Sequence, residues 1–323
     1  MVMVFGMNTE KQKDMHKGEE MEKLKSIVYG HIVGDALGVP AEFSRREELK
    51  KKPIKDMVGY GTYNLPKGTW SDDTSMSLCT MEALKKGKSL NNIMKNFYNW
   101  LNNGDFTPYG KCFDVGGTCR QAINNFVING NFRACGLNDL YSNGSGSLMR
   151  IYPATLFALN YDLIDDRINE IHNISSLTHA HEISLIGCGI YSFILWKLLE
   201  CPDKKCIKKG ILEAFNFYKN YEHIHDYRRL MEIEWYNESG IRSSGYVVDT
   251  LEASLWCVLT TNSYKEAVLK AVNLGGDTDT IGAITGSLAG ALYGYDAIPK
   301  KWIKALPKKD FIDNIIEDFR KEI

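Results

Sequence analysis

Apolar residues recur at helical spacing along most of the chain. From Glu22 onward, Leu24, Ile27, Val28 and Ile32 fall three or four residues apart, which places them on one face of a helix. The same pattern predicts further helices at 74–87, 90–103, 115–128, 147–158, 163–172, 180–200, 204–219, 247–259, 263–272, 279–294 and 309–321. Alternating patterns typical of strands are few and short. The sequence therefore predicts an all-α fold.

The same pattern predicts how the chain is divided. Residues 1–20 show a short apolar run and then charged residues, so we expect a disordered N-terminal tail. The linkers between predicted helices are short or polar, and no sequence repeat or clear boundary divides the rest. We therefore expect residues 21–323 to form a single all-α domain.

Glycine recurs every fourth residue in two of the predicted helices. One stripe lies near the start of the chain and the other near its end: Gly30, Gly34 and Gly38, then Gly282, Gly286, Gly290 and Gly294. A glycine inside a helix costs about 1 kcal/mol relative to alanine, so such stripes need a reason. A helix face without side chains lets another backbone approach closely. We expect both helices to be buried and tightly packed, with each other as the candidate partners.

Composition and charge exclude several classes of protein. The chain is 44% hydrophobic and 24% charged, which is ordinary for a globular protein, and its net charge is −1. This balance gives no overall electrostatic reason to expect nucleic-acid or membrane binding. The pattern contains no run of about 18 apolar residues and no signal peptide, so we expect neither a transmembrane helix nor secretion.

The cysteines indicate a reducing compartment. There are eight of them, none in a CxxC pair, and Cys188 and Cys257 sit in apolar helical stretches where a free thiol packs as a small hydrophobe. We therefore expect a cytoplasmic protein without disulfides.

Two acidic loops carry the candidate chemistry. They read Gly68-Thr69-Trp70-Ser71-Asp72-Asp73-Thr74 and Gly275-Gly276-Asp277-Thr278-Asp279-Thr280, and each opens a predicted helix. Helix N-capping is the simpler explanation, but one Asp suffices for a cap. Carboxylates and hydroxyls without His or Cys are ligands that suit Mg²⁺, Mn²⁺ or Ca²⁺ rather than zinc. The residue types alone leave both explanations open.

These loops resemble the two signature segments of the ADP-ribosylglycohydrolase family. That family includes the dinitrogenase reductase-activating glycohydrolases and the ADP-ribosyl-arginine and ADP-ribosyl-serine hydrolases. Further segments match in the same order: Gly34-Asp35-Ala36-Leu37-Gly38 with Glu42, Phe113-Asp114-Val115-Gly116, Gly146-Ser147-Leu148-Met149-Arg150, Thr178-His179-Ala180-His181, and residues 244–253. The resemblance runs from about Gly30 to Gly294 and implies a compact, orthogonal multi-helix domain.

The resemblance also implies a centre of two divalent cations, Mg²⁺ or Mn²⁺. Carried over residue by residue, the metal ligands are Ser71, Asp72 and Asp73 for one ion, Asp277 and Thr280 for the other, and Asp279 as the bridge. Such a centre can orient the ribose diol and activate a water for attack at the anomeric carbon. The implied acid or base is Glu42 or Asp114, and the sequence does not choose between them.

The substrate contacts implied by the resemblance are less distinctive as residue types. They are Gly116, Gly117, Thr118, Ser147, Met149, His179 and Tyr246. A glycine pair before a helix can bind a diphosphate or simply form a turn. A methionine, a histidine or a tyrosine in such a segment is equally at home in a protein core. Gly117 and Ser145 stand where the family often has Asn, which affects the preference for the leaving group.

The expected activity is hydrolysis of the N- or O-glycosidic bond of ADP-ribose. The expected partners are ADP-ribosylated proteins or small ADP-ribosyl conjugates, and the protein is expected to be a monomer. Two alternatives stay open: a catalytically inactive family member that binds ADP-ribose or serves as a structural protein, and a two-metal phosphohydrolase.

Overall fold

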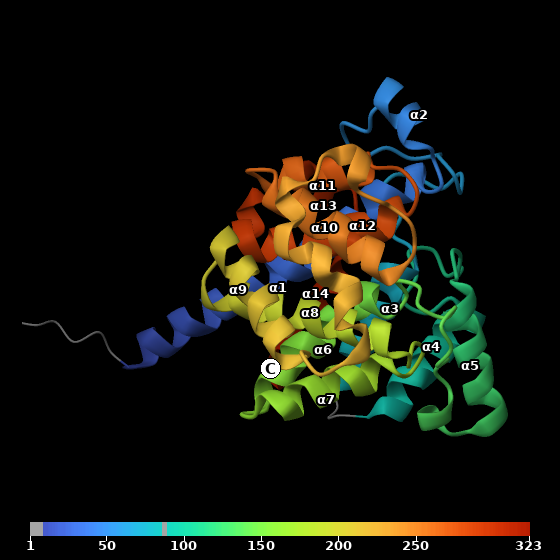
Figure 1. Ribbon diagram of the computed structural model, residues 1–323, viewed down its shortest axis with the longest axis vertical. Coiled ribbons are helices and arrows are strands. Elements are labelled where there is room, and N and C mark those ends of the chain that lie inside the picture. Colours follow the sequence, from blue (N-terminus) through green and yellow to red (C-terminus); the bar gives the residue numbers. More distant parts are fainter. Residues whose placement is uncertain (1–8, 86–88) are drawn as a thin grey trace, which may run out of the picture.

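Helices α1 (Thr9–Gly38) and α12 (Thr278–Tyr293) pack directly against each other at the centre of the fold (Figure 1). The computed structural model describes residues 9–85 and 89–323. A Cβ added at Gly34 would overlap the carbonyl oxygen of Gly282, and one added at Gly286 would overlap that of Gly30. The two glycine stripes are thus each other's partners, and the predicted close contact is confirmed.

The remaining helices surround this pair. They are α2 (Arg46–Lys51), α3 (Asp72–Leu84), α4 (Leu90–Asn103), α5 (Gly117–Asn129), α6 (Tyr152–Phe157), α7 (Ile164–Ser175), α8 (Glu182–Glu200), α9 (Lys204–Phe217), α10 (Val247–Leu259), α11 (Tyr264–Val272), α13 (Lys300–Ile303) and α14 (Lys309–Phe319). Residues 9–85 and 89–323 contain no strand, only two isolated β-bridges. The predicted all-α fold is confirmed.

Helix α8 runs through the core. Most of its residues are buried, and its apolar side chains join the single hydrophobic cluster that also contains Trp70, Trp100 and Trp302. By length and composition alone α8 could cross a membrane, contrary to the sequence expectation, but 78% of its most apolar stretch is buried inside the fold. Burial of this kind is what a core helix requires.

The N-terminal segment differs from the expected disordered tail. Residues 1–8 lie outside the described part of the chain, but helix α1 already begins at Thr9 and projects from the body of the molecule (Figure 1). Residues 9–20 are rich in Glu, Lys, Gln and Met, which have high helix propensity. Once the buried part of α1 supplies a nucleus, extending it through such residues costs little.

Two other segments differ from the predicted elements. The helix expected at 147–158 is divided into a 3₁₀ turn (η3, Leu148–Arg150) and α6, because Pro153 in the first turn of α6 cannot continue a helix from before it. A long 3₁₀ segment, η5 (Glu222–Trp235), was missed. It is interrupted at Glu232, whose backbone is not helical, and the buried residues Ile224, Tyr227 and Leu230 before this break are spaced by three, which is the 3₁₀ period.

Candidate active site

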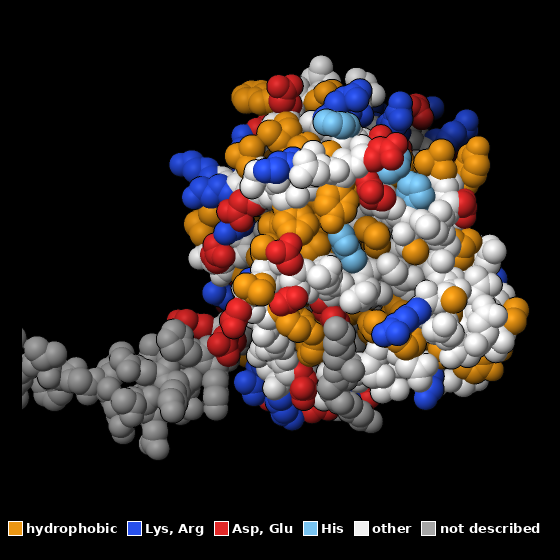
Figure 2. All heavy atoms as spheres, turned by 60° about the horizontal axis from the view of Figure 1, so that its bottom comes forward, with side chains coloured by type: hydrophobic (Ala, Val, Ile, Leu, Met, Phe, Trp, Pro, Cys, Tyr) orange, Lys and Arg blue, Asp and Glu red, His pale blue; other side chains and the backbone are white. Residues whose placement is uncertain are grey.

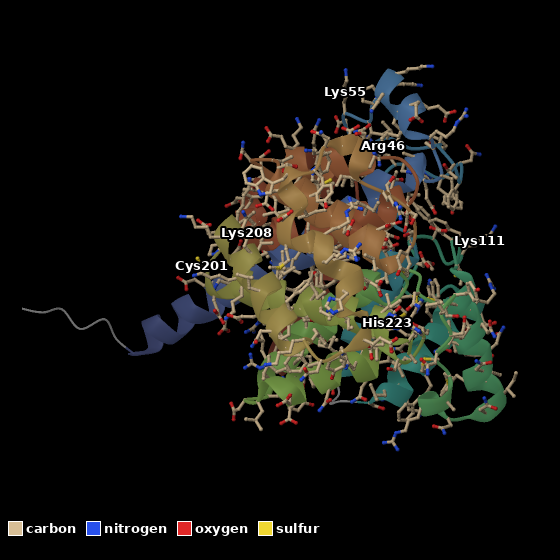
Figure 3. The ribbon with its side chains drawn as sticks, viewed as in Figure 1. Arg46, Lys55, Lys111, Cys201, Lys208 and His223 are labelled. Carbon is tan, nitrogen blue, oxygen red and sulfur yellow. The ribbon has the colours of Figure 1, made fainter. Side chains whose placement is uncertain are left out.

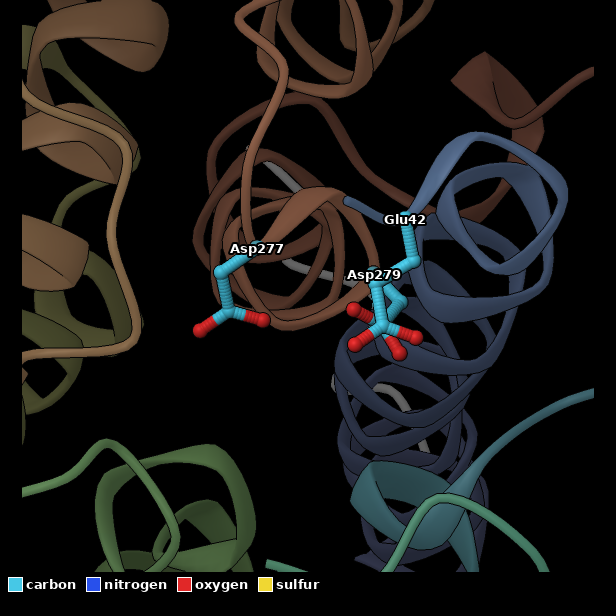
Figure 4. A group of neighbouring side chains, drawn as sticks. All are labelled: Glu42, Asp277 and Asp279. Carbon is cyan, nitrogen blue, oxygen red and sulfur yellow. The ribbon is translucent and has the colours of Figure 1, made fainter. Parts of the chain in front are cut away.

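The packing of α1 on α12 brings the first acidic residues together. Gly38, the last residue of α1, lies so close to Asp279 that a Cβ would overlap the backbone of Asp279. One 3₁₀ turn later (η1, Val39–Ala41) the chain reaches Glu42. Carboxylate oxygens of Glu42, Asp277 and Asp279 lie within 4.8 Å of one another (Figure 4). The glycine stripe is therefore what allows these groups to meet.

The segment after Glu42 is fixed to the second acidic loop. The N–H of Phe43 donates to the carbonyl of Gly276 (2.8 Å), and the N–H of Gly276 donates to the carbonyl of Ser44 (3.0 Å). Arg46, labelled in Figure 3, donates to the carbonyl oxygens of Leu274 (2.7 Å) and Ile241 (2.8 Å). These contacts hold Glu42 and the Gly275–Thr280 loop in one rigid arrangement.

The first acidic loop is held in place by a buried carboxylate of α1. Asp35 accepts hydrogen bonds from the N–H of Ser71 (2.9 Å), the N–H of Thr74 (3.1 Å) and the Thr74 hydroxyl (2.6 Å). It thus satisfies two amides at the start of α3 and fixes the loop that carries Asp72 and Asp73 against α1. Asp35 lies in a segment that resembles the family, but its residue type alone did not predict this positioning role.

Hydroxyls connect the two loops. The Ser71 hydroxyl lies 3.0 Å from Asp73 Oδ2, and the Thr280 hydroxyl lies 3.4 Å from the same oxygen. Ser145 donates to Asp277 Oδ2 at 3.2 Å. These contacts and the cluster of carboxyl groups bring together the predicted metal ligands Ser71, Asp73, Asp277, Asp279 and Thr280, and Asp72 lines the same cavity as Asp277 and Thr280.

Burial makes the charged forms of these acids unfavourable in the metal-free protein. Burial, followed by the nearby Asp114, raises the pKa of Glu42 to about 9. Burial also raises the pKa of Asp72, Asp73 and Asp279 well above the ordinary value, and their mutual repulsion adds to the effect. Like charges held this close without a cation are costly.

The cluster fits a cation better than it fits helix capping. Both carboxylate oxygens of Asp279, Glu42 Oε2 and Asp73 Oδ1 are buried without a hydrogen-bond partner. The cap of α3 is made by Ser71, and the N-cap residue of α12, Asp277, makes no capping bond. A cluster of buried carboxylate oxygens without donors suits a hard divalent cation such as Mg²⁺ or Mn²⁺.

A cavity of about 420 Å³ opens above the acids, within the range typical of small-molecule sites. Its acidic end is formed by Glu42, Asp72, Asp114, Asp277 and Thr280. Its other walls contain five more of the predicted residues: Gly116, Gly117, Thr118, Met149 and His179. Ser71, Asp73 and Asp279 are not part of the cavity lining.

Two predicted substrate residues do not line this cavity. Ser147 is fully buried and hydrogen-bonds with Ser175 (2.9 Å). Tyr246 is 37% exposed and forms an isolated bridge with Gly144, next to the lining residue Gly245. Their contact with substrate stays a prediction.

Two residues that line the cavity or contact a lining residue were missed in the sequence. Tyr63 donates from its hydroxyl to Asp114 Oδ1 at 2.7 Å and packs against Phe113. Phe43 lines the cavity, is 68% exposed and has a φ of 63°. Neither stands in a periodic pattern, so only the position of Phe43 directly after Glu42 could have drawn attention to it.

Comparison with known proteins identifies the family of this chain. A family model described as ADP-ribosylglycohydrolase matches residues 17–323. The chain is 32% identical over 303 residues to ADP-ribosylarginine hydrolase Tri1 of Serratia proteamaculans (strain 568), covering 93% of this chain and 80% of that one. It is 30% identical over 287 residues to ADP-ribosyl-[dinitrogen reductase] glycohydrolase of Rhodospirillum rubrum, covering 87% and 88%.

A solved structure described as an ADP-ribosylglycohydrolase-related protein complex has the same fold. It superposes with a TM-score of 0.79 at 27% identity and covers 94% of this chain and 99% of its own. Fold and relatives define the class, a glycosidase that acts on ADP-ribosyl bonds. The chain belongs to the ADP-ribosylglycohydrolase family. These relatives favour neither the phosphohydrolase nor the inactive alternative.

Proposed function

We propose that this enzyme uses two divalent cations, Mg²⁺ or Mn²⁺, to hydrolyse the N- or O-glycosidic bond between ADP-ribose and a modified side chain or small conjugate. Two relatives are named for ADP-ribosylarginine and for ADP-ribosylated dinitrogen reductase. These names support an arginine-linked ADP-ribosyl protein as the first substrate to test.

One observation carries the metal dependence. Both oxygens of Asp279 are buried without a hydrogen-bond partner, at the point where α1 and α12 meet. A buried carboxylate left without donors is costly unless a cation compensates it. The proposed ligand sets are Ser71, Asp72 and Asp73 for one ion, Asp277 and Thr280 for the other, with Asp279 shared and Glu42 in contact.

When bound, such ions supply Lewis-acid chemistry that orients the ribose diol and makes a water nucleophilic. The protein's own groups supply the rest. Glu42, which would be ionised beside the cations, can accept the proton of the attacking water. Asp114 is oriented by the Tyr63 hydroxyl and is left to hold the ribose or accept a proton.

The setting of the enzyme is also part of the proposal. The cavity is formed within one chain, which supports action as a monomer. All eight cysteines are free thiols, which supports a reducing compartment such as the cytoplasm. On the face shown in Figure 2, acidic and basic side chains are interspersed, which supports no nucleic-acid partner.

The test is product analysis on a panel of substrates. EDTA-treated protein is incubated with ADP-ribosyl-arginine, ADP-ribosyl-serine and an ADP-ribosyl ester, with Mg²⁺, Mn²⁺ or Zn²⁺. We expect free ADP-ribose with Mg²⁺ or Mn²⁺ and none with EDTA or Zn²⁺. Release of AMP or phosphate would support the phosphohydrolase instead, and full activity in EDTA would contradict metal dependence.

A further inference from the structure

A buried chain of hydrogen bonds runs from Arg150 to the cavity. Arg150 is fully buried, and its Nη2 donates to the Thr178 hydroxyl at 2.7 Å. The same hydroxyl lies 2.9 Å from Nδ1 of His179. His179 lines the cavity, and its other ring nitrogen, Nε2, has no hydrogen-bond partner among the described residues. The proposed reaction gives Arg150 and Thr178 no role.

The direction of the hydrogen bonds follows from what each group can do. A guanidinium only donates, so the Thr178 oxygen must accept from Arg150. Two groups can take the hydroxyl hydrogen of Thr178, His179 Nδ1 at 2.9 Å and the Cys119 thiol, and the imidazole nitrogen is the stronger acceptor. A neutral imidazole that accepts at Nδ1 carries its proton on Nε2.

We propose that Arg150 and Thr178 are positioning residues that hold His179 as the neutral Nε2–H tautomer, with this N–H directed into the cavity as a hydrogen-bond donor. Its acceptor is an oxygen of the ADP-ribosyl group, and this part of the proposal rests on the proposed function. The opposite tautomer would present a lone pair to an anionic substrate and to a cavity already rich in carboxylates.

The surroundings of His179 support this arrangement. A Cβ added at Gly146 would lie 2.8 Å from the Cε1 atom of His179, so glycine there keeps the Nε2 edge of the ring uncovered. Burial, and then the nearby Arg150, lower the pKa of His179 to about 3, which keeps the ring neutral. Among the described residues, Arg150 forms no ion pair with a carboxylate. It makes only hydrogen bonds and a contact with the Phe97 ring.

A purely structural role is the rival explanation. Arg150 also approaches the carbonyl of Ile174 at 3.3 Å and could serve only to join η3 to the end of α7. That role would place no constraint on the proton of His179. The tautomer therefore separates the two explanations.

The deciding experiment is long-range ¹H–¹⁵N NMR of the protein labelled with [¹⁵N]histidine. The chain has seven histidines, and the His179 signals are assigned by their loss in His179→Gln. We expect a proton on Nε2 and none on Nδ1. A proton on Nδ1, or on both nitrogens, would overturn the proposal. The spectrum requires neither turnover nor metal. The tautomer proposal can therefore be wrong while ADP-ribose is released, and it can be right while no ADP-ribose is released.

Matched variants test the consequence for binding, with ADP-ribose as the calorimetric probe. Thr178→Ser keeps the hydroxyl and should stay within about twofold of the parental Kd, whereas Thr178→Val, which has the same shape without it, should weaken binding about three- to tenfold. His179→Gln keeps a donor near the Nε2 position and should bind more tightly than His179→Met. Equal affinities within each pair would refute the role in binding. If Thr178→Val does not fold, the histidine pair decides.

Discussion

At the scale of single residues, the carboxyl groups of the site should make the metal-free protein less stable as pH rises. Burial raises the pKa of Glu42 to about 9 and that of Asp35 to about 7. Acids with a raised pKa bind more protons in the folded state than in the unfolded chain. The free energy of unfolding therefore falls between about pH 4 and about pH 9.

Urea unfolding of EDTA-treated protein at about pH 5.5 and about pH 8.5 measures this effect. We expect lower stability at the higher pH. Mg²⁺ should shrink the difference, because a bound cation favours the ionised acids. Metal-free protein that is equally or more stable at pH 8.5 would show that these acids are not buried together as described.

Phe43 stores backbone strain beside the cavity. Its φ of 63° lies in the left-handed region, which costs an ordinary L-residue about 1 kcal/mol or more. Asn tolerates this conformation, and little apolar burial is lost because Phe43 is 68% exposed. We expect Phe43→Asn to raise the free energy of unfolding by about 1 kcal/mol, measured by urea unfolding.

The control for this prediction is Tyr109→Asn. Tyr109 is also an exposed aromatic residue, at 53%, but it does not have a positive φ. This variant should gain no stability. If Phe43→Asn gains no more stability than Tyr109→Asn, the positive φ of residue 43 does not lower the stability of the parent.

At the scale of elements, the packing of α1 on α12 depends on the glycine faces. A Cβ at Gly34 would overlap the backbone of Gly282, so Gly34→Ala should lower the free energy of unfolding by roughly 1–3 kcal/mol. Gly18 lies in the same helix with nothing within 4 Å, and Gly18→Ala should gain up to about 1 kcal/mol from helix propensity. Thermal or urea unfolding of the two variants should therefore shift in opposite directions.

The elements that the sequence predicted well are those with a strong helical period. Helix α10 was predicted with its observed bounds, 247–259, and α11 and α12 within one residue at each end. The glycine period predicted the contact between two distant helices, except at Gly294. Gly294 has a φ of 84°, and a Cβ added there would meet nothing within 4 Å. It therefore ends α12 instead of packing on α1.

Other elements lacked such a signal. Helices α2 and α13 contain only six and four residues, too few to show a period. The 3₁₀ segment η5 has a period of three, which a search for helical spacing does not detect. The break before α6 could be predicted only by giving Pro153 more weight than the apolar pattern around it.

At the scale of the whole molecule, the site joins segments that lie far apart in the sequence. The acidic loops could be recognised because their residue types exceed what capping needs, and their convergence follows from the α1–α12 contact and from Asp35. The hydrogen bond from Tyr63 to Asp114 depends on a loop path without any pattern. Such contacts are set by tertiary packing and could not be derived from the sequence alone.

We propose that the converging carboxylates form a site for divalent cations, with Asp279 shared between them. Asp279→Asn keeps the size of the side chain and removes one negative charge. In EDTA this variant should be at least as stable as the parent, because repulsion among the buried acids is reduced. With Mg²⁺ or Mn²⁺ the parent should gain stability by binding, and the variant should gain much less.

The most direct test is the rise in melting temperature on adding Mg²⁺ or Mn²⁺ to EDTA-treated protein, measured for the parent, Asp279→Asn and Asp165→Asn. Asp165 is an exposed acid in the first turn of α7 and serves as the matched control. We predict a clear rise for the parent and for Asp165→Asn, and little or none for Asp279→Asn. A rise in Asp279→Asn equal to that of the parent would contradict the account.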